Sequence, residues 1–235
     1  MTLHFDHAVI AVPDLEIAIR DYQALGFTVI KGGVHANRAT HNALIVFGNA
    51  TYLELLAPTG EAPTQGQQNF SRLSWREGLT GFALRSDDLE AGAARLRGEG
   101  LKIGEVTPGG RRRPDGKVLE WKTALVDDSF APFLIQDVTP QAWRIPGDPA
   151  ITTHPNHVVG VRGVVIAVGD MEHASNHYAR LLGLRPDSAL NGISLREADS
   201  EEGLYAVRLV CEESPASYFD PERTHGVRFE QVTNR

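Results

Sequence analysis

The chain has 235 residues, of which 42% are hydrophobic, and its 30 acidic and 23 basic side chains give a formal net charge of -7 at pH 7. This balance excludes the basic surface that a nucleic acid or an anionic membrane requires, and no apolar run approaches the roughly 18 residues of a membrane helix. A single cysteine and an N-terminus without signal-peptide features predict a cytoplasmic protein whose partner is a small molecule.

The N-terminal segment predicts a strand, a capped helix and three further strands. FDHAVIAV is apolar and β-branched, Asp14 stands at an N-cap position, and Gly26 closes a stretch with apolar residues at helical spacing. FTVIKGGV, HNALIVFG and TYLELLAP then have the composition of strands. The segment is therefore predicted to form a βαβββ unit.

A second segment repeats this order. GLTGFALRS precedes Asp87 and Asp88, either of which can cap an Ala- and Leu-rich helix that ends near Gly98 or Gly100. LKIGEVT, VLEWKTALVD and APFLIQDV are predicted strands, with PGGRRRPDGK as a polar loop between the first two.

A third segment starts in the same way but is poorer in strands. VRGVVIAV is followed by Asp170 as a helix cap and Gly183 as the helix end, and LVCEES and HGVRFEQV are predicted strands. The stretch from 186 to 203 is polar and gives no clear prediction. Linkers are expected near residues 58 to 70 and 139 to 157, which are rich in Pro, Gly, Gln and Thr.

The tandem units, opening with FDHAVIAV and closing the first unit with TYLELLAP, resemble the vicinal oxygen chelate superfamily, and specifically its glyoxalase-like domain proteins. The resemblance implies an α+β fold in which residues 1–138 form paired βαβββ units, curled into an incomplete barrel around a cleft. Residues 158–235 would be a third, partial unit that packs on the first two or at a dimer interface. Metal ligands in the superfamily come from the first and last strands of each unit.

His7 and Glu54 occupy the ligand positions that the resemblance implies in the first unit. Alternation along the first strand places His7 on one face with Phe5 and Val9. An imidazole and a carboxylate suit Zn, Mn, Ni or Fe(II), and a carboxylate inside an apolar strand is costly to bury without a partner. The competing interpretation is a structural histidine held by hydrogen bonds.

Further histidines stand near these positions. His41, on the strand beside Glu54, is predicted as a third ligand or a proton carrier, so Glu54 and His41 are the predicted catalytic residues; a hydrogen bond to a neighbouring strand is the alternative. His35, in a Gly-flanked segment, is predicted to reach over the cleft towards the substrate. His154 and His157 in the linker motif HPNH have no assigned role. His173 and His177 stand at positions i and i+4 of the third helix, where they could form a metal pair; a solvated helix face is the alternative.

The second unit departs from the pattern. Gly81 aligns with His7, and Gln136 is the expected counterpart of Glu54, so two outcomes stay open: a weak or labile metal site, or a metal-free pocket that binds its ligand by hydrogen bonds. Gln136 is therefore a candidate substrate contact.

The loop PGGRRRPDGK of the second unit carries a basic run that ends at Arg113. Arg113 is predicted to capture a substrate carboxylate or phosphate, and a solvated loop is the alternative. Trp121 is predicted to stack on an organic substrate, with core packing as the alternative.

The favoured function is a metal-dependent lyase or isomerase, or a related enzyme such as a dioxygenase, acting on a small oxygen-chelating substrate. The alternative is a non-catalytic binding protein of the same fold, like the members of the superfamily that sequester antibiotics. Because the third unit has Gly163 in place of His7, it is expected to cover a sheet edge or meet a second subunit, which predicts a homodimer.

Overall fold

The computed structural model describes residues 3–62, 76–128, 130–185, 188–212 and 219–233. The first unit comprises β1 (Leu3–Ala11), α1 (Leu15–Ala24), β2 (Ile30–His35), β3 (Thr40–Val46) and β4 (Tyr52–Pro58). The second comprises β5 (Gly78–Ser86), α2 (Leu89–Gly98), β6 (Thr107–Arg112), β7 (Val118–Leu125) and β8 (Phe133–Asp137). Both units have the predicted βαβββ order, but LKIGEVT is not the strand that was predicted: apart from an isolated bridge at Ile103, the strand begins only at Thr107.

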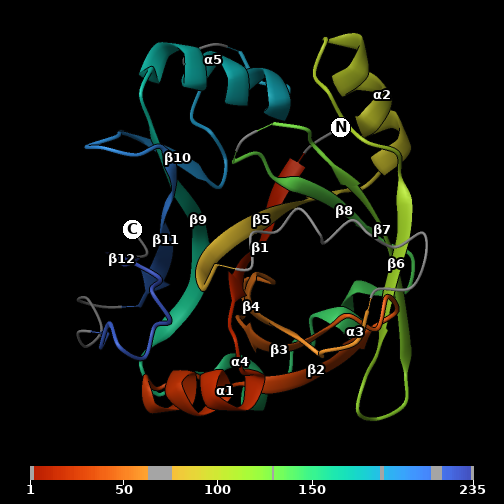
Figure 1. Ribbon diagram of the computed structural model, residues 1–235, viewed down its shortest axis with the longest axis vertical. Coiled ribbons are helices and arrows are strands. Elements are labelled where there is room, and N and C mark those ends of the chain that lie inside the picture. Colours follow the sequence, from red (N-terminus) through yellow and green to blue (C-terminus); the bar gives the residue numbers. More distant parts are fainter. Residues whose placement is uncertain (1–2, 63–75, 129, 186–187, 213–218, 234–235) are drawn as a thin grey trace.

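The two units form one barrel, with strands in the order β1-β4-β3-β2-β6-β7-β8-β5 (Figure 1). Within each unit the first and last strands are parallel, and the units meet through the antiparallel pair β1 and β5. A short ladder between β2 and β6, which pairs Val34 with Arg112 and His35 with Arg111, joins the other side. The predicted barrel of paired units is thus present, and its ring is closed by hydrogen bonds rather than incomplete.

The predicted helix ends are confirmed. The side chain of Asp14 accepts from the Ile17 amide, and Asp88 and Asp170 cap α2 and α5 (Met171–Leu182) in the same way. Gly183 ends α5 in the left-handed conformation, at φ 70°. Capping side chains satisfy backbone amides that the helix cannot pair itself, which explains why these signals were readable from the sequence.

Strand β6 corrects the predicted loop. Its residues include most of PGGRRR, and two glycines explain how so polar a run joins the sheet. A Cβ on Gly109 would collide with the Trp121 ring, and one on Gly110 would collide with the Leu119 carbonyl. Glycine is thus required for β6 to lie against β7, although glycine usually argues against a strand.

The C-terminal part forms a separate sheet in the order β10-β9-β11-β12. Its elements are β9 (Val158–Val168), α5, β10 (Ile193–Glu197), β11 (Gly203–Cys211) and β12 (Phe229–Thr233). Along this sheet the neighbouring strands are paired parallel, then antiparallel, then parallel. The barrel strands β4-β1-β5-β8 are paired in the same sequence of directions. This region therefore repeats the central strands of the paired units rather than a single βαβββ unit.

One apolar core joins the outer face of the barrel, helices α1, α2 and α5, and the C-terminal sheet. It includes Ile10 of β1, Leu84 of β5 and Val164 of β9. At Gly163 the backbone has φ +151°, and a Cβ would collide with the Gly192 carbonyl. The counterpart of His7 in the third segment is thus a close backbone contact.

The segment from 139 to 157 is more than a linker, since it contains α3 (Gln141–Arg144) and α4 (Pro149–Thr152). His154 ties it to the first unit: its Nδ1 accepts from the Thr28 amide at 2.9 Å, and its Nε2 lies 3.1 Å from the Val46 carbonyl. This gives His154 a structural role, while His157 is exposed at φ 59°.

Among the described residues, no helix is both long enough and apolar enough to cross a membrane.

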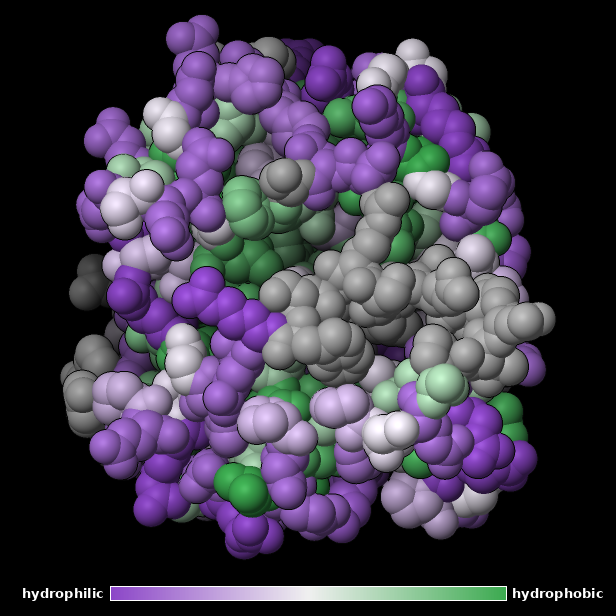
Figure 2. All heavy atoms as spheres, in the orientation of Figure 1, coloured by the Kyte–Doolittle hydropathy of each residue, from purple (hydrophilic) through white to green (hydrophobic). Residues whose placement is uncertain are grey.

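Figure 2 shows polar and charged side chains over most of one face, with apolar side chains gathered in a central hollow. A pocket of about 680 Å³ lies at the seam between β5 and the C-terminal sheet, where Leu79, Phe130 and Leu204 contribute to its lining.

Candidate functional site

A β-bulge in β1 turns two consecutive side chains into the barrel. Phe5 pairs with Leu84 and His7 pairs with Ala83, so Asp6 is left as an extra residue without a partner on β5. A bulge of this kind reverses strand alternation. Phe5 consequently packs in the outer core, which corrects its predicted place beside His7, while Asp6 and His7 are both buried.

His7 lies between two carboxylates. Its Nδ1 is 2.7 Å from Asp6 Oδ1, and its Nε2 is 3.4 Å from Glu54 Oε2. The imidazole also stacks on the Tyr52 ring at 4.3 Å between centroids, and Phe133 meets it edge-on at 5.4 Å. The structure therefore brings His7 and Glu54 together, with Asp6 fixing the orientation of the ring.

Glu54 has two further neighbours on the barrel interior. The Asn42 amide donates to its Oε1 at 2.6 Å, and His35 Nε2 lies 3.6 Å from the same oxygen. The opposite nitrogen of His35 is 2.7 Å from Thr40 Oγ1. His35, predicted as a substrate contact, thus belongs to the same buried group.

Arg144 closes one side of this group by binding two aspartates. It donates to Asp6 at 2.7 and 3.1 Å and to Asp137 at 2.6 and 2.8 Å, and it also donates to the Tyr52 hydroxyl at 2.9 Å. Asp6 belongs to the first unit and Asp137 to the second, so α3 links the units through one guanidinium. This bidentate geometry is the strongest that arginine forms with carboxylates.

The pKa shifts follow from this arrangement. Burial opposes ionisation of Asp6, but the Arg144 guanidinium and His7 outweigh it and hold the Asp6 pKa below its usual range. Burial likewise opposes the charge on Glu54, yet His7 lowers the Glu54 pKa to about 2.

The two histidines shift in opposite directions. Burial lowers the pKa of His7, but hydrogen bonds with Asp6 and Glu54 raise it by more, so the net pKa is raised. Burial dominates at His35 and lowers its pKa to about 4. The His35 imidazole is therefore uncharged at neutral pH.

The second unit supplies no equivalent donors. On β1 and β5, His7 pairs with Ala83, and Val9 pairs with Gly81. An approximate twofold axis between the two strands exchanges these pairs and so relates His7 to Gly81, as predicted. The same axis relates Val9 to Ala83. Val9 is the register partner of Glu54 on β4, and Ala83 is the register partner of Phe133 on β8. Phe133, rather than Gln136, is thus the counterpart of Glu54.

Gln136 points away from the interior. Its side chain accepts from the Leu89 amide at 3.0 Å and donates to the Asp87 carbonyl at 2.9 Å, at the start of α2. The expectation that Gln136 lines the cleft is wrong, because the register of β8 puts it on the outer face.

Other predicted residues divide in the same way. His41 pairs with Ala57 of the outer core, on the face of β3 opposite to Asn42, so the structure does not bring it to Glu54. Arg113 is engaged by the Trp143 carbonyl at 2.9 Å and by Asp115 at 3.0 Å, away from His7 and Glu54. Trp121 does line the interior, where its ring meets His35 edge-on at 6.1 Å.

Several residues of the barrel interior were not predicted as site residues. They are Asp6, Asn42, Tyr52, Arg111, Asp137 and Arg144. Asn42, Tyr52 and Asp137 follow the alternation of their strands, so correct register would have found them. Asp6 needed the bulge, and Arg144 lies in a segment that resembles a linker.

The donors in this group fit a divalent metal in part. Two ligands bound to zinc at ordinary bond lengths and a tetrahedral angle lie ~3.4 Å apart, which matches the distance of 3.4 Å between His7 Nε2 and Glu54 Oε2. The hydrogen bond from His7 Nδ1 to Asp6 is the support that a metal-binding histidine usually has. In the part of the chain that the structure describes, however, no three His, Cys, Asp or Glu side chains form a complete metal-binding cluster.

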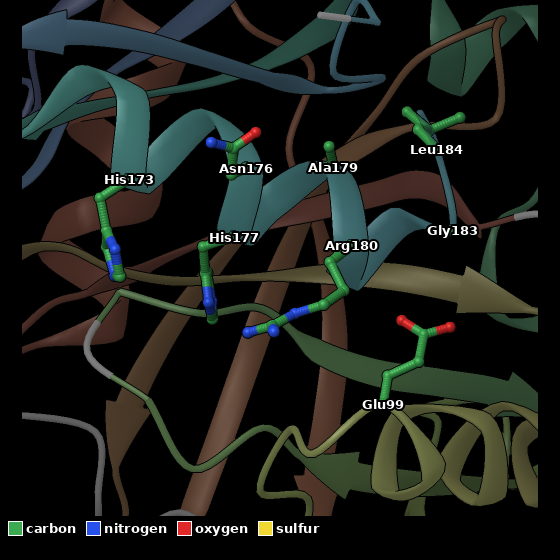
Figure 3. Close-up of a pocket in the computed structure, with 8 residues that line it drawn as sticks. All are labelled: Glu99, His173, Asn176, His177, Ala179, Arg180, Gly183 and Leu184. Atoms are coloured by element: carbon green, nitrogen blue, oxygen red, sulfur yellow. The ribbon is translucent and has the colours of Figure 1, made fainter. Parts of the chain in front are cut away.

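A second hollow, of about 610 Å³, lies between α5 and the end of α2. Figure 3 shows His173 and His177 projecting from the same side of α5, with Arg180 beside His177. His177 Nε2 is 2.9 Å from Asp128 Oδ2, which accounts for this imidazole without a metal. The pair is therefore a polar helix face, in agreement with the simpler interpretation.

Comparisons with known proteins place this geometry in context. A hypothetical protein from Staphylococcus aureus has a similar structure over 98% of this chain and 100% of its own, with a TM-score of 0.76 and 16% identity. The Mn(II)-bound glyoxalase from Novosphingobium aromaticivorans matches 95% of this chain and 68% of its own, with a TM-score of 0.50 and 13% identity.

The 2,3-dioxygenase LapB from Pseudomonas sp. KL28 matches 90% of this chain and 76% of its own, with a TM-score of 0.52 and 14% identity. At these identities the likeness concerns the fold. A search of curated proteins finds no match.

The family described as "Glyoxalase-like domain" matches residues 5–182, which span both barrel units, β9 and α5. The chain belongs to the glyoxalase-like domain family of the vicinal oxygen chelate superfamily.

Proposed function

We propose that this protein is a metal-dependent enzyme, a lyase, isomerase or related enzyme, that acts on a small substrate with adjacent oxygen atoms. The observation that carries the proposal is the buried pair of His7 Nε2 and Glu54 Oε2, 3.4 Å apart inside the barrel. These two side chains would hold the metal, with Asp6 orienting His7. When bound, a divalent cation supplies Lewis-acid polarisation of the substrate oxygens.

The surrounding residues provide the remaining functions. His35 is neutral at pH 7, since burial lowers its pKa to about 4, and its Nε2 faces Glu54 at 3.6 Å. We assign to His35 the proton-carrying role that the sequence analysis gave to His41. Trp121 and Phe133 contribute apolar walls that exclude water from the reacting atoms.

Metal titration of the protein, purified without a histidine tag, tests this function. Mn(II) and Zn(II) are the first cations to use, because the related glyoxalase is Mn(II)-bound and zinc suits nitrogen and oxygen donors. We expect one site per chain with modest affinity in the wild type and none in His7→Ala. His4→Ala is the matched control, since His4 is exposed on the same strand.

Deuterium exchange provides the catalytic readout. The zinc-loaded protein in D₂O should exchange protons next to the carbonyl of 2-oxo acids, as followed by NMR, and His35→Gln should slow this exchange. Wild-type metal content in His7→Ala would refute the metal role. Metal binding without exchange across a panel of carbonyl compounds would argue against catalysis.

The second candidate function is a non-catalytic small-molecule binder. Gly81 and Phe133 at the counterparts of the two donors favour it, because half of the superfamily's ligand set is missing. A wild-type protein that binds small molecules but no metal would support this function. The homodimer and the cytoplasmic location remain predictions, and analytical ultracentrifugation tests the first.

A further inference from the structure

The barrel interior contains two arginines in contrasting situations. Arg144 is neutralised by Asp6 and Asp137, with short contacts to both. Arg111 is only 4% exposed, yet within the described part of the chain its guanidinium donates to the Gly32 and Arg144 carbonyls and to no carboxylate. None of the ion pairs formed within 4.0 Å among the described residues includes Arg111.

The position of Arg111 points it at the proposed site. Arg111 of β6 is the cross-strand partner of His35 of β2, so the two side chains leave the sheet on the same face. His35 in turn faces Glu54. The charge of Glu54 also acts on the Arg111 guanidinium, although the Glu54 carboxylate is already engaged by His7 and Asn42.

Two carbonyl contacts leave most of the binding capacity of Arg111 unused. A guanidinium has five N–H donors in a planar fork, and burying its charge without an anion is costly. A lysine would satisfy one or two carbonyls equally well, whereas the fork is suited to a carboxylate. The nearby wall is apolar, with Leu119 as the cross-strand partner of Arg111 on β7 and Trp121 further along the same strand.

We propose that Arg111 binds a carboxylate of the substrate, so that the substrate is an oxo or hydroxy acid with an apolar side chain rather than a neutral compound. The proposal rests on the proposed function for the location of the reacting oxygens. It also replaces Arg113 by Arg111 as the residue of the basic run that recognises an anion. The apolar side chain of the acid would lie against Leu119 and Trp121.

Calorimetric titration with two matched probes tests this assignment. The probes are 4-methyl-2-oxopentanoate and its primary amide, which differ in charge but hardly in shape, each added to the zinc-loaded protein. We expect the wild type to bind the acid at least about tenfold more tightly than the amide, as a charge-assisted pair predicts. Arg111→Gln should reduce this preference, of which only the part due to zinc remains, and leave amide binding unchanged.

Two variants separate recognition from folding. Arg111→Lys keeps the charge and should retain part of the preference for the acid, and its circular dichroism shows whether the barrel is intact. Arg112→Gln is the control, because the Arg112 side chain is exposed and, among the described residues, donates only to the nearby Gly116 carbonyl. It should bind both probes like the wild type.

The outcomes distinguish this subsite from the proposed function. Equal affinity of the wild type for acid and amide, or an unchanged preference in folded Arg111→Gln, would overturn the role of Arg111 while zinc binding through His7 still stands. A wild type that binds neither probe overturns it as well. If the wild type bound no zinc, the proposed function itself would be refuted.

Discussion

The two units of the barrel have the same order of helices and strands but place different chemistry at equivalent positions. Where the first has His7 and Glu54, the second has Gly81 and Phe133. The second unit is not inert, because its Asp137 binds Arg144 and its Arg111 faces the centre of the barrel. One unit therefore supplies the donor atoms, and the other supplies a cation and an apolar wall.

This division explains why so many charges can be buried in one barrel. Arg144 lies between Asp6 of the first unit and Asp137 of the second, and His7 lies between Asp6 and Glu54. Each carboxylate has a cationic or polar neighbour, which offsets its desolvation. The following predictions test whether the two units depend on each other as this arrangement implies, from the largest expected effect to the smallest.

Arg144→Ala should cause the largest loss of stability. It removes the bidentate partner of Asp6, which is 0% exposed, and leaves that carboxylate with His7 at 2.7 Å and the more distant Arg85 guanidinium at 3.5 Å. Breaking a buried pair on one side costs about 3–5 kcal/mol of the free energy of unfolding. Urea denaturation at pH 7 measures this value.

The double variant Arg144→Met with Asp6→Asn is the control for Arg144→Ala. It removes the buried carboxylate together with its partner and should recover part of the loss. A loss below about 1 kcal/mol in Arg144→Ala would show that the units do not depend on this link.

His35→Gln should change how stability depends on pH. Burial lowers the folded-state pKa of His35 to about 4 from its ordinary value of 6.5, so the unfolded chain takes up a proton first as the pH falls. Its neutral form thus stabilises the fold fully above pH 6.5, and this stability is lost between pH 6.5 and about 4. The shift corresponds to about 3 kcal/mol at most.

Urea midpoints between pH 4.5 and 6.5 isolate this effect. The contribution of Glu54, whose pKa is lowered to about 2, is lost only below pH 4.5, the ordinary pKa of a glutamate side chain. The contribution of His7 has the opposite sign, since its raised pKa stabilises the fold below pH 6.5 and is lost as the pH rises through the folded value. An unchanged slope in His35→Gln would contradict the assignment.

Gly81→His with Phe133→Glu should make the second unit resemble the first. The variant places an imidazole and a carboxylate at the register positions equivalent to His7 and Glu54. Zinc affinity should rise about tenfold or more, which corresponds to roughly 1.4 kcal/mol. Zinc titration measures it.

Gly81→His with Gln136→Glu is the matched control. Gln136 lies on the outer face at the start of α2, so a carboxylate there should leave zinc affinity close to that of Gly81→His alone. A gain with Gln136→Glu instead of Phe133→Glu would restore the alignment drawn from the sequence and contradict the register of β8.

The sequence predicted those features that depend on local signals. The caps at Asp14, Asp88 and Asp170, and the order of both βαβββ units, follow from side chains that satisfy nearby backbone groups and from strand composition. His7 and Glu54 could be proposed because the resemblance marked their positions.

The errors came from features that depend on distant parts of the chain. The bulge at Asp6 reverses the alternation of β1 and appears only in its pairing with β5. The counterpart of Glu54 depends on the register between β5 and β8, and the role of Arg144 depends on α3 bringing this side chain to Asp6 and Asp137. No local composition signals such contacts, since each joins residues far apart in the sequence.

Arg113→Ala should have the smallest effect, and it separates Arg113 from Arg111 in the same basic run. Arg113 lies at the end of the β6–β7 hairpin, where it bonds to the Trp143 carbonyl and pairs with Asp115, a partly exposed neighbour. Such a pair contributes about 0–1 kcal/mol, so the melting temperature should fall by a few degrees at most. Thermal unfolding followed by circular dichroism measures this shift.

Binding of 4-methyl-2-oxopentanoate should be unchanged in Arg113→Ala but weakened in Arg111→Gln, because only Arg111 extends from the inner face beside His35. If Arg113→Ala lost the acid and Arg111→Gln retained it, the recognising cation would be at the hairpin, as the sequence analysis expected, and the second unit would not supply the charge inside the barrel.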